Sequence, residues 1–151
     1  MESVVLRKLR ARQLSESEVR AVIRAHPLDE QSADALLRGL RRHGYVDDAA
    51  LAEQLVRSAV ERKGQGRQVI AQTLAKRGVP RDVADAAMSA LPDDDAERAL
   101  EFALTKARSM SRLDQDTALR RLVGQLARRG YPSSVAMTAA RRALDESRSA
   151  G

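Results

Sequence analysis

The residue types that most often carry catalysis are scarce in this chain. Its 151 residues include no cysteine and only two histidines, His26 and His43. The absence of cysteine excludes a disulfide framework, a thiolate zinc site and a cysteine nucleophile. Each histidine stands at a predicted helix end, where polar side chains are common, so neither is assigned as a proton shuttle. We therefore expect no catalytic residue, no metal site and no cofactor, and we predict that the protein is not an enzyme.

Two acidic runs and one glycine-rich turn could be taken for ligand sites. Asp47-Asp48 and Asp93-Asp94-Asp95 have no His or Glu at ligand spacing, and capping of the helices that follow explains both runs. The segment Gly64-Gln65-Gly66 lacks the Gly-Lys-Ser/Thr ending of a phosphate loop and does not follow a strand. We interpret the aspartates as helix caps and the glycines as a turn or hinge.

Basic side chains are the remaining candidates for chemistry. The net charge is +6 and the pI is near 10.4, and the middle of the chain is its most basic part per residue. This balance indicates an acidic partner, although the solvated helix faces of an arginine-rich protein explain it equally well. The candidate partner-binding residues cluster around predicted helix joints and are Arg57, Arg62, Lys63, Arg67, Lys76, Arg77, Arg128 and Arg129.

Helical periodicity accounts for almost the whole chain. No alternating run of β-branched and aromatic residues is long enough to predict a strand. Ser15 and Glu18 form a capping box that predicts the start of one helix. Gly44, Gly78 and Gly130 predict three helix ends. Because most apolar residues are Ala, Leu and Val, we predict an all-α fold of closely packed helices without a large central core.

An internal repeat organises these helices. Residues 74–80 (LAKRGVP) and 126–132 (LARRGYP) are near copies that lie 52 residues apart. A third copy, more divergent, is centred on Pro27. We predict three tandem three-helix repeats, at 1–45, 46–91 and 92–147, followed by a frayed tail at 148–151. Small units stacked in this way form an elongated, curved helical array with one long face.

Two tyrosines bear on direct binding of nucleic acid. Tyr45 and Tyr131 are the aromatic residues in predicted turns, where a base of a single strand could stack. For both we favour packing over a helix joint. Helix-turn-helix readout of DNA is a further possibility, but no set of base-reading side chains accompanies the turns.

The middle of the chain resembles a known family. The motifs that carry the resemblance are Gly44-Tyr45-Val46-Asp47-Asp48, Leu51-Ala52, Arg62-Lys63-Gly64, Ile70, Leu74 and Gly78-Val79. They are similar to the central signature of the RecX regulatory proteins, the bacterial modulators of the RecA recombinase. Residues 9–19 resemble the opening of that family, and residues 129–131 resemble its closing unit. The N-terminus is short for the family, which leaves open whether a further N-terminal segment belongs to the protein.

The resemblance implies an all-α, non-enzymatic protein of three three-helix repeats that binds the RecA filament on single-stranded DNA, in the filament groove or at its end. It also implies inhibition of the ATPase, strand-exchange and SOS co-protease activities of RecA. We expect a cytoplasmic monomer, with possible direct contact to nucleic acid and no membrane partner. The rival hypothesis is a direct DNA-binding helical-repeat protein without a filament partner.

Overall fold

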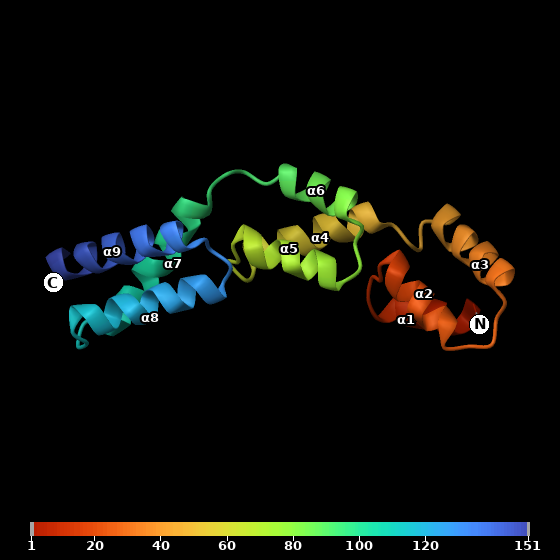
Figure 1. The fold of residues 1–151 in the computed structure, drawn as a ribbon, viewed down its shortest axis with the longest axis horizontal. Coiled ribbons are helices and arrows are strands. Elements are labelled where there is room, and N and C mark those ends of the chain that lie inside the picture. Colours follow the sequence, from red (N-terminus) through yellow and green to blue (C-terminus); the bar gives the residue numbers. More distant parts are fainter. Residues whose placement is uncertain (1, 151) are drawn as a thin grey trace. The chain divides into compact units, whose positions relative to one another are not determined.

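The computed structural model describes residues 2–150, without the side chain of residue 150 (Figure 1). Its α-helices are α1 (Glu2–Ala11), α2 (Glu16–Arg24), α3 (Glu30–Arg42), α4 (Asp48–Glu61), α5 (Arg67–Lys76), α6 (Arg81–Ser89), α7 (Asp95–Ala107), α8 (Gln115–Arg128) and α9 (Ser133–Ala150). A short 3₁₀ helix, η1 (Arg108–Met110), follows α7. No strand occurs between residues 2 and 150, which confirms the predicted all-α class.

The helices form two compact units. Unit 1 comprises the described residues up to Val56 together with Gln72–Ala90, and unit 2 comprises Arg57–Ala71 with the described residues from Leu91 onward. The boundaries fall inside α4 and α5, so the predicted middle repeat contributes to both units. The division into three repeats stays a prediction. Helix α9 runs as far as Ala150, through most of the segment predicted to fray.

The core of unit 1 is formed by apolar stripes on short amphipathic helices. Val19 and Ile23 lie four residues apart on α2, and Leu37 and Leu40 lie three apart on α3, so each pair shares one helix face. Val5 of α1 is completely buried in the same cluster. This arrangement uses aliphatic side chains alone, as expected for a chain with so few aromatic residues.

The core of unit 2 is rich in alanine. Ala99, Ala103 and Ala107 recur at every fourth position of α7 and are all buried. They pack in one cluster with Ala136 and Ala140 of α9. Because alanine side chains are small, the axes of two such helices can approach closely. The buried alanines of α7 and α9 are thus the small core residues on which the prediction of closely packed helices was based.

Helices α3, α5 and α8 end in the same way. Each is followed by a glycine with positive φ, +76° at Gly44, +77° at Gly78 and +97° at Gly130. In each case the N–H of the next residue donates to a carbonyl of the last helical turn, namely Tyr45 to Leu40 (2.9 Å), Val79 to Leu74 (3.0 Å) and Tyr131 to Leu126 (3.2 Å). This is the Schellman motif, in which glycine is favoured because a side chain would be strained at that φ. All three predicted helix ends are confirmed.

Candidate partner-binding site

A close backbone contact joins the α5–α6 turn to the start of α2 in unit 1. A Cβ atom added at Gly78 would lie 2.6 Å from Cβ of Ser17 and 2.8 Å from its Oγ. Real Cβ atoms do not approach other atoms so closely, so the glycine is required here for packing as well as for its φ. We call this contact, with the residues Gln13, Ser15–Glu18, Asp48, Arg77 and Gly78, the first joint.

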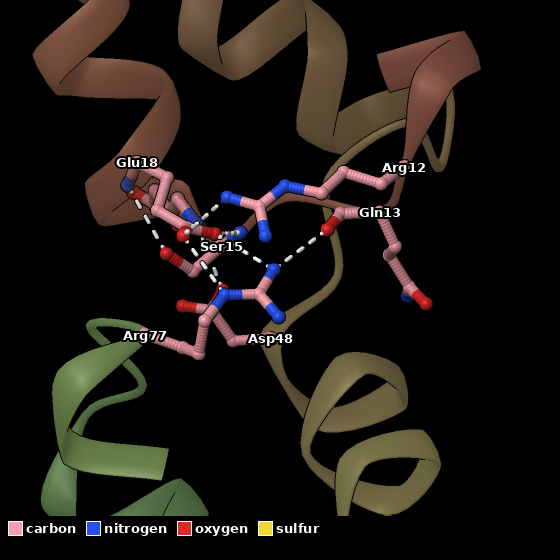
Figure 2. A network of polar contacts seen from close by, with 7 residues as sticks. Arg12, Gln13, Ser15, Glu18, Asp48 and Arg77 are labelled. Carbon is pink, nitrogen blue, oxygen red and sulfur yellow. Dashed lines mark hydrogen bonds and ion pairs between the residues drawn. The ribbon is translucent and has the colours of Figure 1, made fainter. Parts of the chain in front are cut away.

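Arg77 connects the two sides of the first joint (Figure 2). Its Nε donates to Oε2 of Glu18 at 2.8 Å, and its Nη2 donates to Oε1 of Glu18 at 3.1 Å. The same Nη2 donates to the main-chain oxygen of Gln13 at 2.8 Å. The two charged side chains are only 18% and 22% exposed, so the pair is better shielded from water than an ordinary surface ion pair.

Glu18 belongs at the same time to the capping box that was predicted from the sequence. The main-chain N–H of Ser15 donates to Oε1 of Glu18 at 2.9 Å, and the N–H of Glu18 donates to Oγ of Ser15 at 3.1 Å. Burial would raise the pKa of Glu18. The hydrogen bonds from Arg77 and Ser15, with the charges of Arg77 and Arg12, outweigh burial and hold that pKa below its ordinary value.

Asp48 caps a helix other than the one it begins. Its Oδ1 accepts the main-chain N–H of Glu16, the first residue of α2, at 2.9 Å. Asp47 is the aspartate that caps α4, through a bond from the N–H of Ala50 to its Oδ1 at 3.1 Å. Burial raises the pKa of Asp48, reinforced by the charges of Glu16 and Asp47 and opposed by the bond from Glu16 N–H. The predicted capping role is thus correct for Asp47, while Asp48 holds the first joint together.

Unit 2 contains a second contact of the same kind, between the α8–α9 turn and the start of α5. A Cβ atom at Gly130 would lie 2.6 Å from the main-chain nitrogen of Val69, and one at Gly66 would lie 2.5 Å from the oxygen of Gly130. The N–H of Gly66 donates to the oxygen of Arg129 at 2.7 Å. We call this contact, with residues 63–69, Asp94, Asp95, Arg98, Phe102 and 129–131, the second joint.

The side chains of the second joint differ from those of the first. Arg129 donates from Nη1 to the main-chain oxygen of Lys63, and its guanidinium lies 4.0 Å from the centre of the Phe102 ring. Tyr131, which is 2% exposed, donates its hydroxyl hydrogen to the oxygen of Gly64 at 2.8 Å. Packing over a helix joint, the role favoured for Tyr131 from the sequence, is confirmed.

Asp95 and Arg98 complete the second joint. Oδ2 of Asp95 accepts the main-chain N–H of Arg67, the first residue of α5, over a long 3.5 Å. Arg98 Nη2 donates to Oδ1 of the buried Asp95 at 2.7 Å, and its Nη1 donates to the oxygen of Gln65 at 2.7 Å. Asp94 makes no side-chain cap to its own helix and accepts from Nε of Arg98 at 3.0 Å instead. The predicted capping role is therefore wrong for Asp94.

The eight predicted partner-binding residues separate into two groups. Five of them are exposed and make no ion pair within the described part of the chain: Arg57, Arg62, Lys63, Lys76 and Arg128. Arg77 and Arg129 are half-buried and form the bonds within the joints described above. Arg67 is half-buried as well, and its main-chain N–H is the donor to Asp95.

Within unit 2 the exposed cations come together from two turns. Arg62 and Lys63 follow α4, Arg128 ends α8, and the bond from Gly66 to Arg129 holds these two turns side by side. Lys76 lies at the end of α5 and belongs to unit 1. The structure therefore brings a turn of the second predicted repeat next to a turn of the third, and we call the exposed cations beside these turns, Arg62, Lys63 and Arg128, the basic surface.

Sequence reasoning missed the acidic and aromatic partners of the joints. Asp48 and Asp95 each accept the first N–H of a helix that lies far away in the sequence. Glu16 and Arg67, which donate these N–H groups, lie 51 residues apart, close to the repeat spacing. A comparison of acidic residues between repeats could have found Asp48 and Asp95. No comparable signal marks Phe102, because the first joint has no aromatic residue at this place.

Among the residues that the structure describes, no cluster of three or more His, Asp or Glu side chains could hold a metal ion. Nδ1 of the exposed His43 lies 2.8 Å from the carbonyl oxygen of Gly39 in its own helix. None of the described helices is both long and apolar enough to cross a membrane.

Known proteins resemble this chain in sequence and in fold. Residues 47–88 match the family model of the second three-helix domain of RecX, and residues 93–139 match that of the third. A regulatory protein RecX of Mycolicibacterium smegmatis is 41% identical over 143 residues, which cover 89% of this chain and 74% of that protein. The RecX protein of Corynebacterium efficiens is 36% identical, and the match covers 87% of this chain and 66% of that protein.

Solved structures agree with these matches. The crystal structure of RecX from Lactobacillus salivarius has the same fold, with a TM-score of 0.81 and 20% identity over 96% of this chain and 94% of that one. A second crystal structure, of a regulatory protein RecX, gives a TM-score of 0.72 and 25% identity over 89% of this chain and 66% of that one. The two domain matches and the relatives that cover most of its length show that this chain belongs to the RecX family of regulatory proteins.

Proposed function

We propose that this protein binds the RecA nucleoprotein filament on single-stranded DNA and inhibits its ATPase, strand-exchange and SOS co-protease activities. It would act in the cytoplasm as a monomer, without catalysis of its own, in the regulation of homologous recombination and DNA repair. The observation that carries this proposal is the basic surface of Arg62, Lys63 and Arg128 in a member of the RecX family. A filament that contains DNA is an anionic partner of the kind such a surface favours.

The exposed and half-buried cations would have different roles. Arg57, Arg62, Lys63, Lys76 and Arg128 are free to pair with acidic or phosphate groups of a partner. Arg77 and Arg129 already have partners, and breaking these bonds would cost part of any gain in affinity. We therefore assign direct contact to the exposed group and assign Arg77 and Arg129 to the joints that position it.

The exposed cations could inhibit RecA without catalysis, because the affinities of several weak ion pairs combine. Each exposed ion pair contributes little, but several pairs on one protein convert later contacts into intramolecular ones and raise the overall affinity. A protein bound in this way to neighbouring filament subunits would oppose the subunit motions that hydrolysis and strand exchange require. Whether it acts along the groove or at the filament end, the same charges would be used.

One comparison tests the function and its basic surface together. The protein is titrated onto bare single-stranded DNA, and onto the same DNA coated with RecA and a non-hydrolysable nucleotide. We expect tighter binding to the coated strand, and reversal of charge in Arg62→Glu/Lys63→Glu should weaken that binding at least tenfold because the repulsion replaces attraction (about 1.4 kcal/mol per factor of ten). Equal or tighter binding to bare DNA would favour the rival, a direct DNA-binding protein.

A matched variant distinguishes the contribution of the basic surface to filament binding from that of the overall net charge. Arg108 and Arg112 are also exposed and lie at the other end of α7 from the second joint. The double variant Arg108→Glu/Arg112→Glu changes the net charge equally and should bind the coated strand nearly as well as the unchanged protein. An equal loss in both variants would assign the effect to overall charge and refute the specific surface.

A further inference from the structure

The three Schellman helix ends have different side chains at the position after glycine, and these side chains differ in their exposure to solvent. Val79 is 6% exposed and Tyr131 is 2% exposed, so both side chains are buried, that of Tyr131 in the second joint. Tyr45 occupies the same position at the end of α3 and is 51% exposed. The packing role that the sequence suggested for Tyr45 is therefore wrong. The aromatic ring of Tyr45 is therefore exposed to water, although the Schellman hydrogen bond holds its main chain in place.

The surroundings of Tyr45 limit the freedom of its ring. Its main-chain N–H is bonded to Leu40, and the next residue, Val46, is buried in the core of unit 1. The ring of His43 is stacked near one face of the Tyr45 ring, with centroids 6.3 Å apart and planes inclined by 24°. The contact of His43 Nδ1 with Gly39 orients the imidazole. An exposed ring held in this way loses little conformational entropy when a flat ligand stacks on it.

A pocket lies beside the Tyr45 ring in unit 1. Its volume is about 410 Å³, within the range of small-ligand sites, and it is lined by Leu6, Leu9, Arg10, Gln13, Gly44 and Tyr45. Leu6 and Leu9 lie three residues apart on one face of α1 and supply an apolar floor, and Gln13, which follows the helix, supplies an amide at its edge. Figure 2 shows that the amide of Gln13 extends away from the Arg77 ion pair, whose bond to the Gln13 carbonyl holds this segment.

The charges around the pocket favour an anionic occupant. Arg10 lines it, and Arg7 stands one turn earlier on α1; both are exposed and form no ion pair within residues 2–150. No carboxylate is among the lining residues, and the two that follow Tyr45 in the chain are engaged elsewhere, since Asp47 caps α4 and Asp48 accepts from Glu16. An aromatic ring, an apolar floor and free cations together match a nucleobase with its phosphates.

We propose that this pocket is a binding site for single-stranded nucleic acid, in which a base stacks on Tyr45 above Leu6 and Leu9 while Arg10 contacts the backbone. Gln13 can both donate to and accept from the edge of the base. The site does not depend on the proposed filament function, because it requires no RecA and uses residues of unit 1 that lie apart in the sequence from Arg62, Lys63 and Arg128.

Binding of a fluorescently labelled oligothymidylate to the full chain, followed by anisotropy, tests the proposal. The variant Tyr45→Ala should weaken binding roughly 5- to 140-fold, the range that corresponds to about 1–3 kcal/mol per stacked base, whereas Tyr45→Phe should bind as well as the unchanged protein. An abasic oligomer of the same length carries the same charge without bases. Its affinity should be lower and should not respond to Tyr45→Ala.

An exposed leucine provides a matched control for Tyr45. Leu28 is the other exposed large apolar residue in the described chain, and Leu28→Ala should leave oligothymidylate binding unchanged. Equal affinity of Tyr45→Ala and unchanged protein, or equal affinity for the abasic and normal oligomers, would overturn base stacking. The protein could instead bind an acidic aromatic peptide and not the oligomer. If Tyr45→Ala then abolished binding of the peptide, the pocket would be assigned to a protein partner. Loss of filament binding alone would leave the oligomer result intact, so the two proposals fail separately.

Discussion

The first and second joints share their steric design and differ in the groups that reinforce it. In both, a glycine of positive φ lies directly against the first turn of a helix from earlier in the chain, and the preceding arginine donates to a main-chain oxygen. Arg77 also pairs with a carboxylate, whereas Arg129 stacks on a ring and a neighbouring tyrosine supplies a hydroxyl bond. The close glycine contact is therefore the common requirement, and different polar groups can stabilise it.

The arginine before glycine has a titratable partner in the first joint and a main-chain partner in the second. Glu18 joins the two sides of the first joint as a carboxylate, and its pKa is held below the ordinary value near 4.5. The bond of Arg129 to Lys63 uses a carbonyl, which does not titrate, and Tyr131 donates to a carbonyl as well. Variants that act on the shared contact should affect both joints alike, while variants of the polar groups should separate them.

The largest effect should come from removal of the shared glycine contact. Gly78→Ala and Gly130→Ala should each lower the free energy of unfolding by about 2–5 kcal/mol, because left-handed strain adds to overpacking. Gly44→Ala is the control, since its φ is equally positive but a Cβ there meets nothing within 4 Å. It should cost only about 1–2 kcal/mol of strain. Urea unfolding followed by circular dichroism measures all three, and equal losses would show that close packing adds nothing.

Removal of the Glu18 charge should have an intermediate effect that depends on pH. Glu18→Gln should lower the free energy of unfolding by about 2 kcal/mol at neutral pH, because Arg77 loses a charged partner in a shielded place. Since the pKa of Glu18 is lowered in the folded protein, this contribution is complete above pH 4.5 and is lost as the pH falls through that lowered pKa.

Comparison of Glu18→Gln with the unchanged protein across pH isolates the contribution of the Glu18 charge to stability. Stabilities of the unchanged protein and Glu18→Gln should converge as the pH falls below 4.5, because the unchanged protein also loses the charge. Asp48, whose raised pKa acts in the opposite direction, is common to both proteins and cancels in the difference. Glu53→Gln, at an exposed position of α4, should track the unchanged protein at every pH. A constant gap between the unchanged protein and Glu18→Gln would exclude the ion pair as the source of acid sensitivity.

The smallest effect should distinguish the two tyrosines. Tyr131→Phe removes the hydroxyl bond to Gly64 and should cost about 1 kcal/mol of unfolding free energy. Tyr45→Phe should cost almost nothing, because the Tyr45 side chain is half exposed. Thermal unfolding of both variants provides the measurement. A loss of equal size at Tyr45 would mean that its hydroxyl contributes to the stability of unit 1.

Local features of this protein were predictable because they depend on residues close together in the chain. The capping box of Ser15 and Glu18 requires groups three positions apart, and its two bonds are both present. The three glycine helix ends follow from the φ that such ends require. Asp94 and Asp48 were misassigned because the sequence cannot say which N–H group a carboxylate will meet once distant segments pack together.

The candidate site was predictable only in its composition. The eight basic residues were identified, but nothing in the sequence separated exposed Lys63 from Arg129, whose guanidinium covers Phe102. Arg77 lies 59 residues from its partner Glu18 and was expected to face a binding partner instead. Residues so far apart acquire their environment from the packing of whole helices, which periodicity within one helix does not specify.

The sequence by itself determined the helical class, the positions of helix starts and ends and the basic character of the protein, because propensity, capping and charge are properties of short segments. Tertiary structure alone decided which cations remain exposed and which hold the joints. It also decided that Tyr131 is buried while Tyr45, at the same point of the same motif, faces a pocket. The physical reason is that burial and pairing depend on what packs against a residue, and here those neighbours come from elsewhere in the chain.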